Sequence, residues 1–237
     1  MNLLKLSYSI LFTLLFAIGL VGGSPVDRSV PLTLVSGDFG LADGPSWQGW
    51  YLTVPDPKAQ VVKRFIIKQN KWNVLAKEKR FSASFFNHGK SYFADHGEGA
   101  IRCLDQNNKW SLVYQEDLAE DKRRKPNDLV VDRSGGVYFT LTGPGEVVYV
   151  SPQGKAQTVA SDVQTPNGLI LSPDEKTLYV SEYVPKKILS FKVGKNGALN
   201  AKKLFAKMDD GQPDLKGEEG MCVDRAGNED RAGARDR

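Results

Sequence analysis

The hydrophobic and polar positions of the chain follow one recurring unit: two apolar residues, a short polar turn, and an apolar run that contains tyrosine. Three clear copies begin at Phe85, Val130 and Ile170, an earlier degenerate copy begins at Trp47, and a later one begins at Met221. The first four copies are spaced by roughly 40 residues, which is the period of a propeller blade. The repetition therefore predicts an all-β protein built as a β-propeller.

The segments around each copy favour the same fold. Turn formers occupy the expected hairpin positions, namely Gly89, Gly135–Gly136, Pro173–Asp174 and Gly227, and glycine suits turns where φ becomes positive. A further strand and turn follow, as in 146–150 before 151–154. About four short strands per repeat is typical of propeller blades. A solenoid or a sandwich is the alternative, but a sandwich would show less internal similarity.

The N-terminus has the pattern of a secretory signal. One basic residue precedes an almost wholly apolar stretch at 10–21, and Gly22, Gly23 and Ser24 follow. We therefore assign 1–23 to a signal peptide and 24–228 to the propeller, and we expect a secreted or periplasmic protein. The alternative is an uncleaved membrane anchor, for which the apolar stretch is short.

Export to an oxidising compartment would permit one disulfide between Cys103 and Cys222, the two cysteines of the chain. Both lie in short, partly apolar, strand-like segments, so the sequence favours two separate buried thiols over a bridge.

Charge and motifs narrow the function classes. The formal net charge is +4, and the densest basic segment, 121–125, is typical of a solvated loop. The sequence contains no recognition helix, RNA-binding motif or zinc-finger spacing, so we expect no nucleic-acid partner, and no membrane partner once the signal is removed. There is no G-x-S-x-G elbow, which disfavours a serine hydrolase.

Oxygen-bearing side chains recur just before the repeat units. Asp43, Asn127, Asn167 and Glu219 occupy equivalent places, and we call these four the ring residues. Repeat symmetry would bring them together where the innermost strands begin, at the mouth of the central channel. Carboxylate and amide oxygens suit calcium or another hard divalent cation. Neither His88 nor His96 belongs to this set, which disfavours a histidine-rich zinc site.

These motifs together resemble the gluconolactonase/regucalcin (senescence marker protein) family. The resemblance rests on Asp43-Gly44-Pro45-x-Trp47, Pro126-Asn127-Asp128, Pro166-Asn167-Gly168, Glu219-Gly220-Met221-x-Val223-Asp224 and Ala94-Asp95-His96-Gly97. It extends from about Leu41 to Asn228 and implies a six-bladed propeller that hydrolyses a sugar lactone or similar lactone. It also implies one divalent cation, calcium in the first place, with zinc or manganese as alternatives.

The resemblance assigns roles residue by residue. It implies Asp43, Asn167 and Glu219 as metal ligands, Glu219 also as the catalytic base, and Asn127 as a substrate contact. Asp43 stands where the family commonly has Glu, and Glu219 where it commonly has Asp, which puts the cation affinity in doubt. Further substrate contacts are expected from His96, Arg124 and Lys125, although a loop histidine and a solvated charge pair are the simpler interpretations.

The repeat pattern is lost after Asn228. The charged segment 229–237 is poor in apolar residues, so we expect an aberrant tail that does not pair as a strand. This pattern predicts a propeller truncated after about four and a half blades, with exposed edges that favour self-association and with doubtful activity. Two other functions stay open: a non-catalytic or degenerate propeller that binds a small molecule or protein, and an esterase for other lactones or phosphotriesters.

Overall fold

The computed structural model describes residues 34–208, 215–223 and 229–235, and side chains are described for 34–208 and 220–223. The signal-peptide assignment, 1–23, lies outside the described residues. The part of the chain that the structure describes has no helix long and apolar enough to cross a membrane.

The described residues form five antiparallel sheets, which follow one another in sequence order. The first sheet contains β1 (Ser46–Trp47), β2 (Tyr51–Asp56), β3 (Val61–Ile66) and β4 (Lys71–Lys77). The second contains β5 (Phe81–Asn87), β6 (Lys90–Asp95), β7 (Ala100–Leu104) and β8 (Trp110–Gln115). The third contains β9 (Leu129–Val131), β10 (Val137–Leu141), β11 (Glu146–Val150) and β12 (Ala156–Ala160). The fourth contains β13 (Pro166–Leu171), β14 (Thr177–Glu182), β15 (Lys187–Val193) and β16 (Leu199–Lys207). The fifth contains β17 (Leu215–Val223) and β18 (Glu229–Arg235). Three short 3-10 helices lie between strands: η1 (Ile67–Gln69), η2 (Glu120–Lys122) and η3 (Lys195–Gly197).

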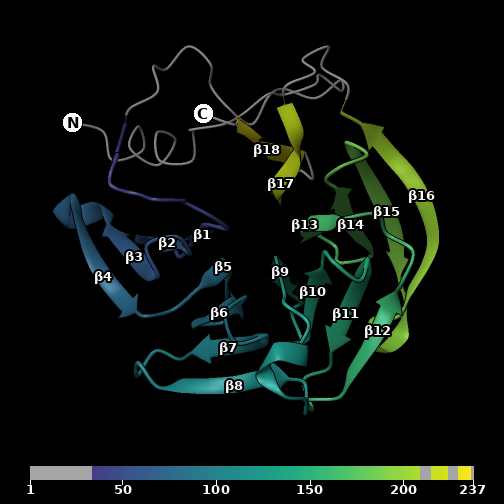
Figure 1. Ribbon diagram of the computed structural model, residues 1–237, viewed down its shortest axis with the longest axis horizontal. Coiled ribbons are helices and arrows are strands. Elements are labelled where there is room, and N and C mark those ends of the chain that lie inside the picture. The colour runs from purple at the N-terminus through teal and green to yellow at the C-terminus, as the bar shows by residue number, and fades with distance from the viewer. Residues whose placement is uncertain (1–33, 209–214, 224–228, 236–237) are drawn as a thin grey trace.

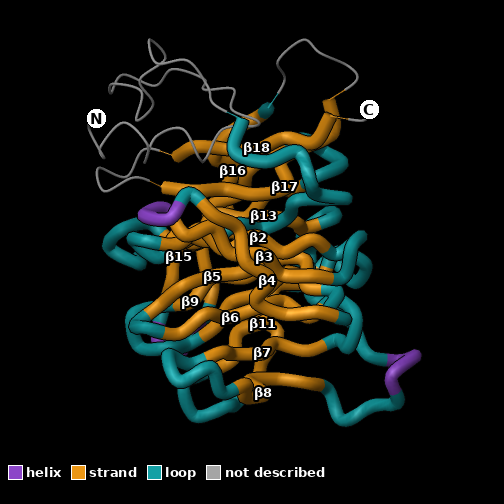
Figure 2. Tube along the Cα trace, turned by 90° about the vertical axis from the view of Figure 1, so that its left-hand side faces the viewer, coloured by secondary structure: helices purple, strands orange, loops and turns teal. Residues whose placement is uncertain are grey.

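The sheets lie around a common centre (Figure 1). The first strand of each sheet lies nearest the centre, and the last strand of each four-stranded sheet lies at the periphery. In the side view of Figure 2 the strands run across the molecule, and loops and turns gather at its two ends. This arrangement of consecutive four-stranded meanders is propeller-like and all-β, as the repeat pattern predicts.

Apolar side chains between neighbouring sheets hold this arrangement together. Phe139 of the third sheet is fully buried and belongs to a cluster that continues into the second sheet. Tyr138, which points to the other face of the same strand, belongs to a cluster shared with the fourth sheet. The alternation along β10 therefore serves two inter-sheet cores, because successive side chains of a strand point to opposite faces.

The hairpin turns confirm the predicted turn chemistry. His88 and Gly89 have φ of 46° and 76° between β5 and β6, which corresponds to the two positive values of a type I′ turn. Gly135 has φ of 91° in the next hairpin, and Glu175, after Pro173–Asp174, has φ of 56°.

The expectation that 229–237 does not pair as a strand is wrong for 229–235. Residues Glu229–Arg235 form β18 and pair with β17, with Val223 opposite Glu229 and Leu215 opposite Arg235. Backbone hydrogen bonding does not need an apolar side chain, so a charged segment can complete a hairpin. The expectation of separate thiols is confirmed, since Cys103 is buried in β7 without a disulfide. Cys222 lies partly buried in β17.

Candidate functional site

Five strands bring the candidate site together. β5 lies beside both β1 and β9, and β13 lies beside both β9 and β17. Asp43 and Asn127 lie in the loops that lead into β1 and β9, and Asn167 is the second residue of β13. Because these strands start at the same end of the sheets, their entry loops meet at one face of the molecule, which we call the entry face.

Asp43 is half-buried and is placed by a constrained loop. Its N–H donates to the carbonyl of Pro55 at 3.1 Å. The next residue, Gly44, has φ of 41°, and a Cβ there would lie 2.3 Å from the Cα of Ala83, so only glycine fits. Upstream, the fully buried carboxylate of Asp56 accepts the N–H groups of Gly40 and Leu41 at 2.8 and 3.0 Å. The loop that carries Asp43 is therefore fixed on both sides.

Asn127 is fixed through its main chain. Its N–H donates to the carbonyl of Thr140 at 2.9 Å, and its carbonyl accepts the hydroxyl of Ser82 at 2.6 Å. Ser82 belongs to β5 in the neighbouring sheet and is buried. A hydroxyl of one sheet thus holds a ring residue of the next.

Asp128 adds a second carboxylate beside Asp43. The pKa of Asp128 is raised from 3.8 to about 7, mainly by burial and in addition by the negative charge of Asp43, while hydrogen bonds from the N–H groups of Leu129 and Leu169 oppose the shift. Those two bonds measure 2.7 and 3.3 Å. The interaction with Asp43 shows that negative charge is concentrated here.

Asn167 lies at an irregularity of β13. The register with β14 shifts between Pro166 and Leu169, and such irregularities re-aim side chains. The carbonyl of Asn167 accepts the hydroxyl of Thr140 at 2.7 Å, and the carbonyl of Pro166 accepts the hydroxyl of Thr142 at 2.6 Å. The third sheet therefore holds the entry loop of the fourth.

Glu219 lies in β17, which is beside β13, but its side chain is outside the described residues. Three ring residues and Asp128 are therefore described at the entry face. Among residues with described side chains, no group of three or more His, Cys, Asp and Glu could hold a metal ion. The predicted ligand set is Asp43, Asn167 and Glu219. It lies outside this statement, because Asn167 is not one of those four residue types and the side chain of Glu219 is not described.

The remaining predicted contacts have partners within the chain. His96 Nδ1 lies 3.1 Å from the carbonyl oxygen of Pro126, and the Nζ of Lys125 donates to the carbonyl of Gly97 at 2.8 Å. Arg124 is ion-paired with both Glu116 and Glu146. Both carboxylates belong to this chain, so the ion pairs give the guanidinium of Arg124 a structural role. A substrate contact by Arg124 stays a prediction.

Sequence reasoning missed three residues of this site. Asp128 follows Asn127 in the Pro-Asn-Asp motif but does not itself occupy a ring position. Ser82 precedes Phe85 by the same three residues that separate Asn127 from Val130, so the repeat itself could have revealed it. Thr140 lies inside a second strand, where no repeat signal marks it.

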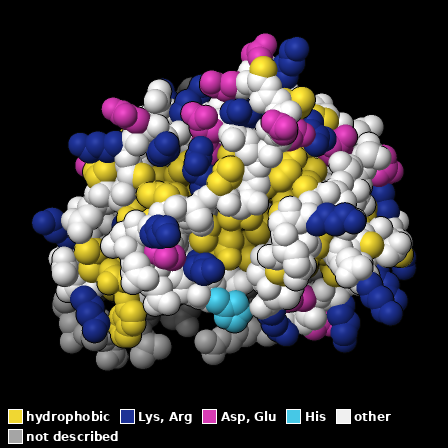
Figure 3. Space-filling view, turned by 90° about the horizontal axis from the view of Figure 1, so that it is seen from below, with side chains coloured by type: hydrophobic (Ala, Val, Ile, Leu, Met, Phe, Trp, Pro, Cys, Tyr) yellow, Lys and Arg dark blue, Asp and Glu magenta, His cyan; other side chains and the backbone are white. Residues whose placement is uncertain are grey.

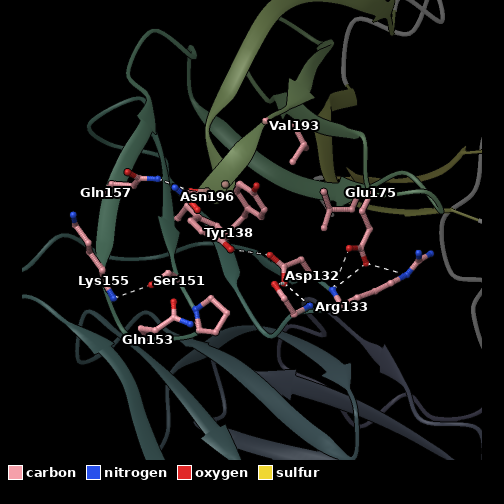
Figure 4. Close-up of a pocket in the computed structure, with 16 residues that line it drawn as sticks. Asp132, Arg133, Tyr138, Ser151, Gln153, Lys155, Gln157, Glu175, Val193 and Asn196 are labelled. Carbon is pink, nitrogen blue, oxygen red and sulfur yellow. Dashed lines mark hydrogen bonds and ion pairs between the residues drawn. The ribbon is translucent and has the colours of Figure 1, made fainter.

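The structure contains a cavity of about 640 Å³ that none of the predicted site residues lines. It lies between the third and fourth sheets (Figure 4), at the turns that follow β9 and β13. These turns are at the opposite end of the strands from the entry face. Three of its four charged side chains are paired: Arg133 with Glu175, and Asp132 with the hydroxyl of Tyr149, whereas Lys155 also lines the cavity. The predicted site residues lie at the entry face and not in this cavity.

The face viewed in Figure 3 shows no concentration of one charge among the described residues. Figure 3 views the molecule from the side on which β8 lies, and Lys and Arg side chains are dispersed there among hydrophobic and acidic ones. Leu112 and Trp110 of β8 are exposed apolar residues, and the ring of Trp110 packs against those of Phe81 and Phe93.

The fold and the entry face define the class: a propeller-like all-β protein with an oxygen-rich site where its inner strands begin. Residues 41–229 match the family described as the SMP-30/gluconolactonase/LRE-like region, and the chain belongs to this family.

Individual relatives agree with this assignment. A gluconolactonase of Zymomonas mobilis is 27% identical over 86% of this chain and 67% of its own length. A lactonase drp35 of Staphylococcus haemolyticus is 46% identical, but over 24% of this chain and 19% of its own length.

Solved structures show the same architecture. A gluconolactonase of Xanthomonas campestris superimposes with a TM-score of 0.70 at 25% identity, covering 85% of this chain and 77% of the other. The calcium-binding protein regucalcin of Agrobacterium tumefaciens gives a TM-score of 0.65 at 17% identity, covering 81% and 66%. This second likeness concerns the fold alone.

Proposed function

We propose that this protein hydrolyses a sugar lactone or a similar lactone at the entry face, with the help of one divalent cation. The family match over 41–229 is the observation that carries the proposal. The gluconolactonases among its relatives support the lactone as substrate, and the oxygen-bearing side chains at the starts of the inner strands supply a polar site for it.

The donor chemistry of the entry face fits a hard cation. Asp43 and Asp128 each bring a carboxyl group to this face, and the negative charge of Asp43 contributes, after burial, to the raised pKa of Asp128. Asp43, Asn167 and Glu219 would hold the cation, and calcium is the first candidate because all three offer oxygen. When bound, the cation would polarise the lactone carbonyl and stabilise negative charge on its oxygen.

The chain's own groups have defined tasks in this proposal. Glu219 takes a proton from the attacking water, whose oxygen forms a bond to the lactone carbonyl carbon. The ring C–O bond then breaks, and the leaving oxygen receives a proton, which yields the open hydroxy acid. Asn127 and His96 would orient the substrate by hydrogen bonds, and Lys125 would meet a hydroxyl or acidic group at the rim.

A binding function without catalysis is the second candidate. The 640 Å³ cavity on the opposite face is the observation that favours it. We rank it below lactone hydrolysis, because none of the predicted site residues lines this cavity and the family match favours a lactonase.

Turnover of D-glucono-1,5-lactone by the purified chain tests the proposal. The rate is measured after EDTA treatment and again after addition of calcium, zinc or manganese. We expect turnover that returns with a cation and is lost in Glu219→Gln. A folded chain without turnover under any of these ions would shift the assignment to the binding function. Expression with 1–23 included, followed by N-terminal sequencing, would separately test export and signal cleavage.

A further inference from the structure

Buried hydroxyl groups recur wherever the structure describes a ring residue. Ser84 donates to the carbonyl of Gly44, next to Asp43, at 2.9 Å. Ser82 donates to the carbonyl of Asn127, and Thr140 to that of Asn167. In each case the hydroxyl belongs to one sheet, and the carbonyl that it binds lies in the first strand of the neighbouring sheet or in the loop that leads into that strand. These bonds join neighbouring sheets at the entry face.

Thr140 has the most extensive contacts of the three. It is fully buried in β10. Its N–H donates to the carbonyl of Asp128 at 3.0 Å, and its carbonyl accepts the N–H of Asn127 at 2.9 Å. Its hydroxyl accepts the N–H of Asp128 at 3.2 Å and donates to the carbonyl of Asn167 at 2.7 Å. Thr140 therefore forms hydrogen bonds with three residues of the entry face, namely Asn127, Asp128 and Asn167.

The chemistry of the hydroxyl makes it difficult to replace. A hydroxyl offers one donor and two acceptor positions, and here the donor serves the fourth sheet while an acceptor serves the third. Valine has nearly the same shape but offers neither. A valine at this position would leave the partly buried carbonyl of Asn167 and the partly buried N–H of Asp128 without this partner. The main chain on both sides could then shift, and the attached side chains would move with it.

We infer that Thr140 is a positioning residue for the entry-face site: its hydroxyl holds the main chain of Asn167 at a fixed place relative to Asp128, and so sets the relative positions of two neighbouring site residues. This inference rests on the proposed function, because it assigns to Asn167 the role of a cation ligand. Thr140 itself contacts neither cation nor substrate.

The test uses one hydroxyl deletion, one conservative variant and one matched control. Thr140→Val removes the hydroxyl, and Thr140→Ser keeps it. Thr53→Val is the control, because Thr53 is equally buried in a second strand. The hydroxyl of Thr53 accepts from Gln48 and Arg64, at 3.0 and 3.4 Å, and neither belongs to the site. Calcium affinity is measured by isothermal titration calorimetry, and kcat/KM and Tm are measured on the same samples.

We expect Thr140→Val to weaken calcium binding by about tenfold, as is usual when a group that orients a metal ligand is removed. Thr140→Ser should stay within about twofold of the unsubstituted chain, and Thr53→Val should lose Tm without losing calcium affinity. Should Thr140→Val not fold, Thr140→Cys replaces it, because a thiol is a weak donor of similar size. The calcium affinity of Thr140→Cys should be lower than that of Thr140→Ser, but by no more than the roughly tenfold loss expected for Thr140→Val.

Two results would overturn the inference alone: calcium affinity unchanged in the hydroxyl-deletion variant, or an equal loss in Thr53→Val. An unsubstituted chain that neither binds calcium nor hydrolyses a lactone would overturn the proposed function, and the inference with it. Calcium binding to the unsubstituted chain therefore distinguishes the two failures.

Discussion

The carboxyl group of Asp128 should control how the stability of the cation-free protein depends on pH. Its pKa is raised from 3.8 to about 7 in the folded state. The folded protein therefore binds this proton more tightly than the unfolded chain does. Stability from this group is fully present below about pH 4 and is lost as the pH rises to about 7. The shift of about three units sets a ceiling of about 4 kcal/mol.

Asp128→Asn removes the charge and keeps the shape. The amide oxygen retains one of the hydrogen bonds from Leu129 and Leu169, and loss of the other costs about 1–2 kcal/mol. We expect the variant to be more stable than the unsubstituted chain by about 2 kcal/mol at pH 8, and no more stable than it at pH 4. Denaturant unfolding in EDTA from pH 4 to 8 measures both.

The control is Asp117→Asn, which changes an exposed carboxylate outside the site and should leave the pH profile unchanged. Identical pH profiles for Asp128→Asn and the unsubstituted chain would refute the reasoning. Added calcium should reduce the advantage of the variant, because a nearby cation favours the ionised carboxylate.

Three further substitutions test individual parts of the structure. Gly44→Ala should lower the free energy of unfolding by more than about 1 kcal/mol and weaken calcium binding, because of the contact with Ala83; unchanged denaturant and calorimetric titrations would count against the fixed loop. Phe139→Ala should destabilise by about 3–5 kcal/mol, since Phe139 is fully buried between two sheets; a loss under about 1 kcal/mol in denaturant unfolding would contradict that core. Arg124→Gln should cost about 1 kcal/mol and change KM for the lactone by less than twofold, because its partners are Glu116 and Glu146; a large rise in KM would restore its substrate role.

The repeat pattern predicted the fold because each blade is a local unit. The apolar pair, turn and tyrosine strand at Val130–Thr140 specify one hairpin without help from the rest of the chain, and β9 and β10 form there. The turn positions could also be predicted, because Gly89 and Gly135 adopt positive φ values that favour glycine. The pattern failed at 229–235, because strand pairing there depends on the edge that β17 offers and not on the segment's own apolar content.

Only part of the candidate site could be predicted from the sequence. Asp43, Asn127 and Asn167 occupy equivalent repeat positions, and the structure places them at the starts of neighbouring inner strands. The groups that hold them were not visible, because they act between sheets. The bonds from Ser82 to Asn127 and from Thr140 to Asn167 join residues 45 and 27 positions apart. Ser82 occupies the repeat position that corresponds to Asn127, but nothing in the sequence marks Thr140 as the partner of a carbonyl in the next sheet.

The most direct test of the central claim is lactone hydrolysis by the purified chain with and without a cation, with Glu219→Gln as the companion variant. The account predicts turnover that EDTA abolishes, that calcium restores, and that the glutamine variant lacks although it folds. Turnover that persists in EDTA, or that survives in Glu219→Gln, would contradict the account.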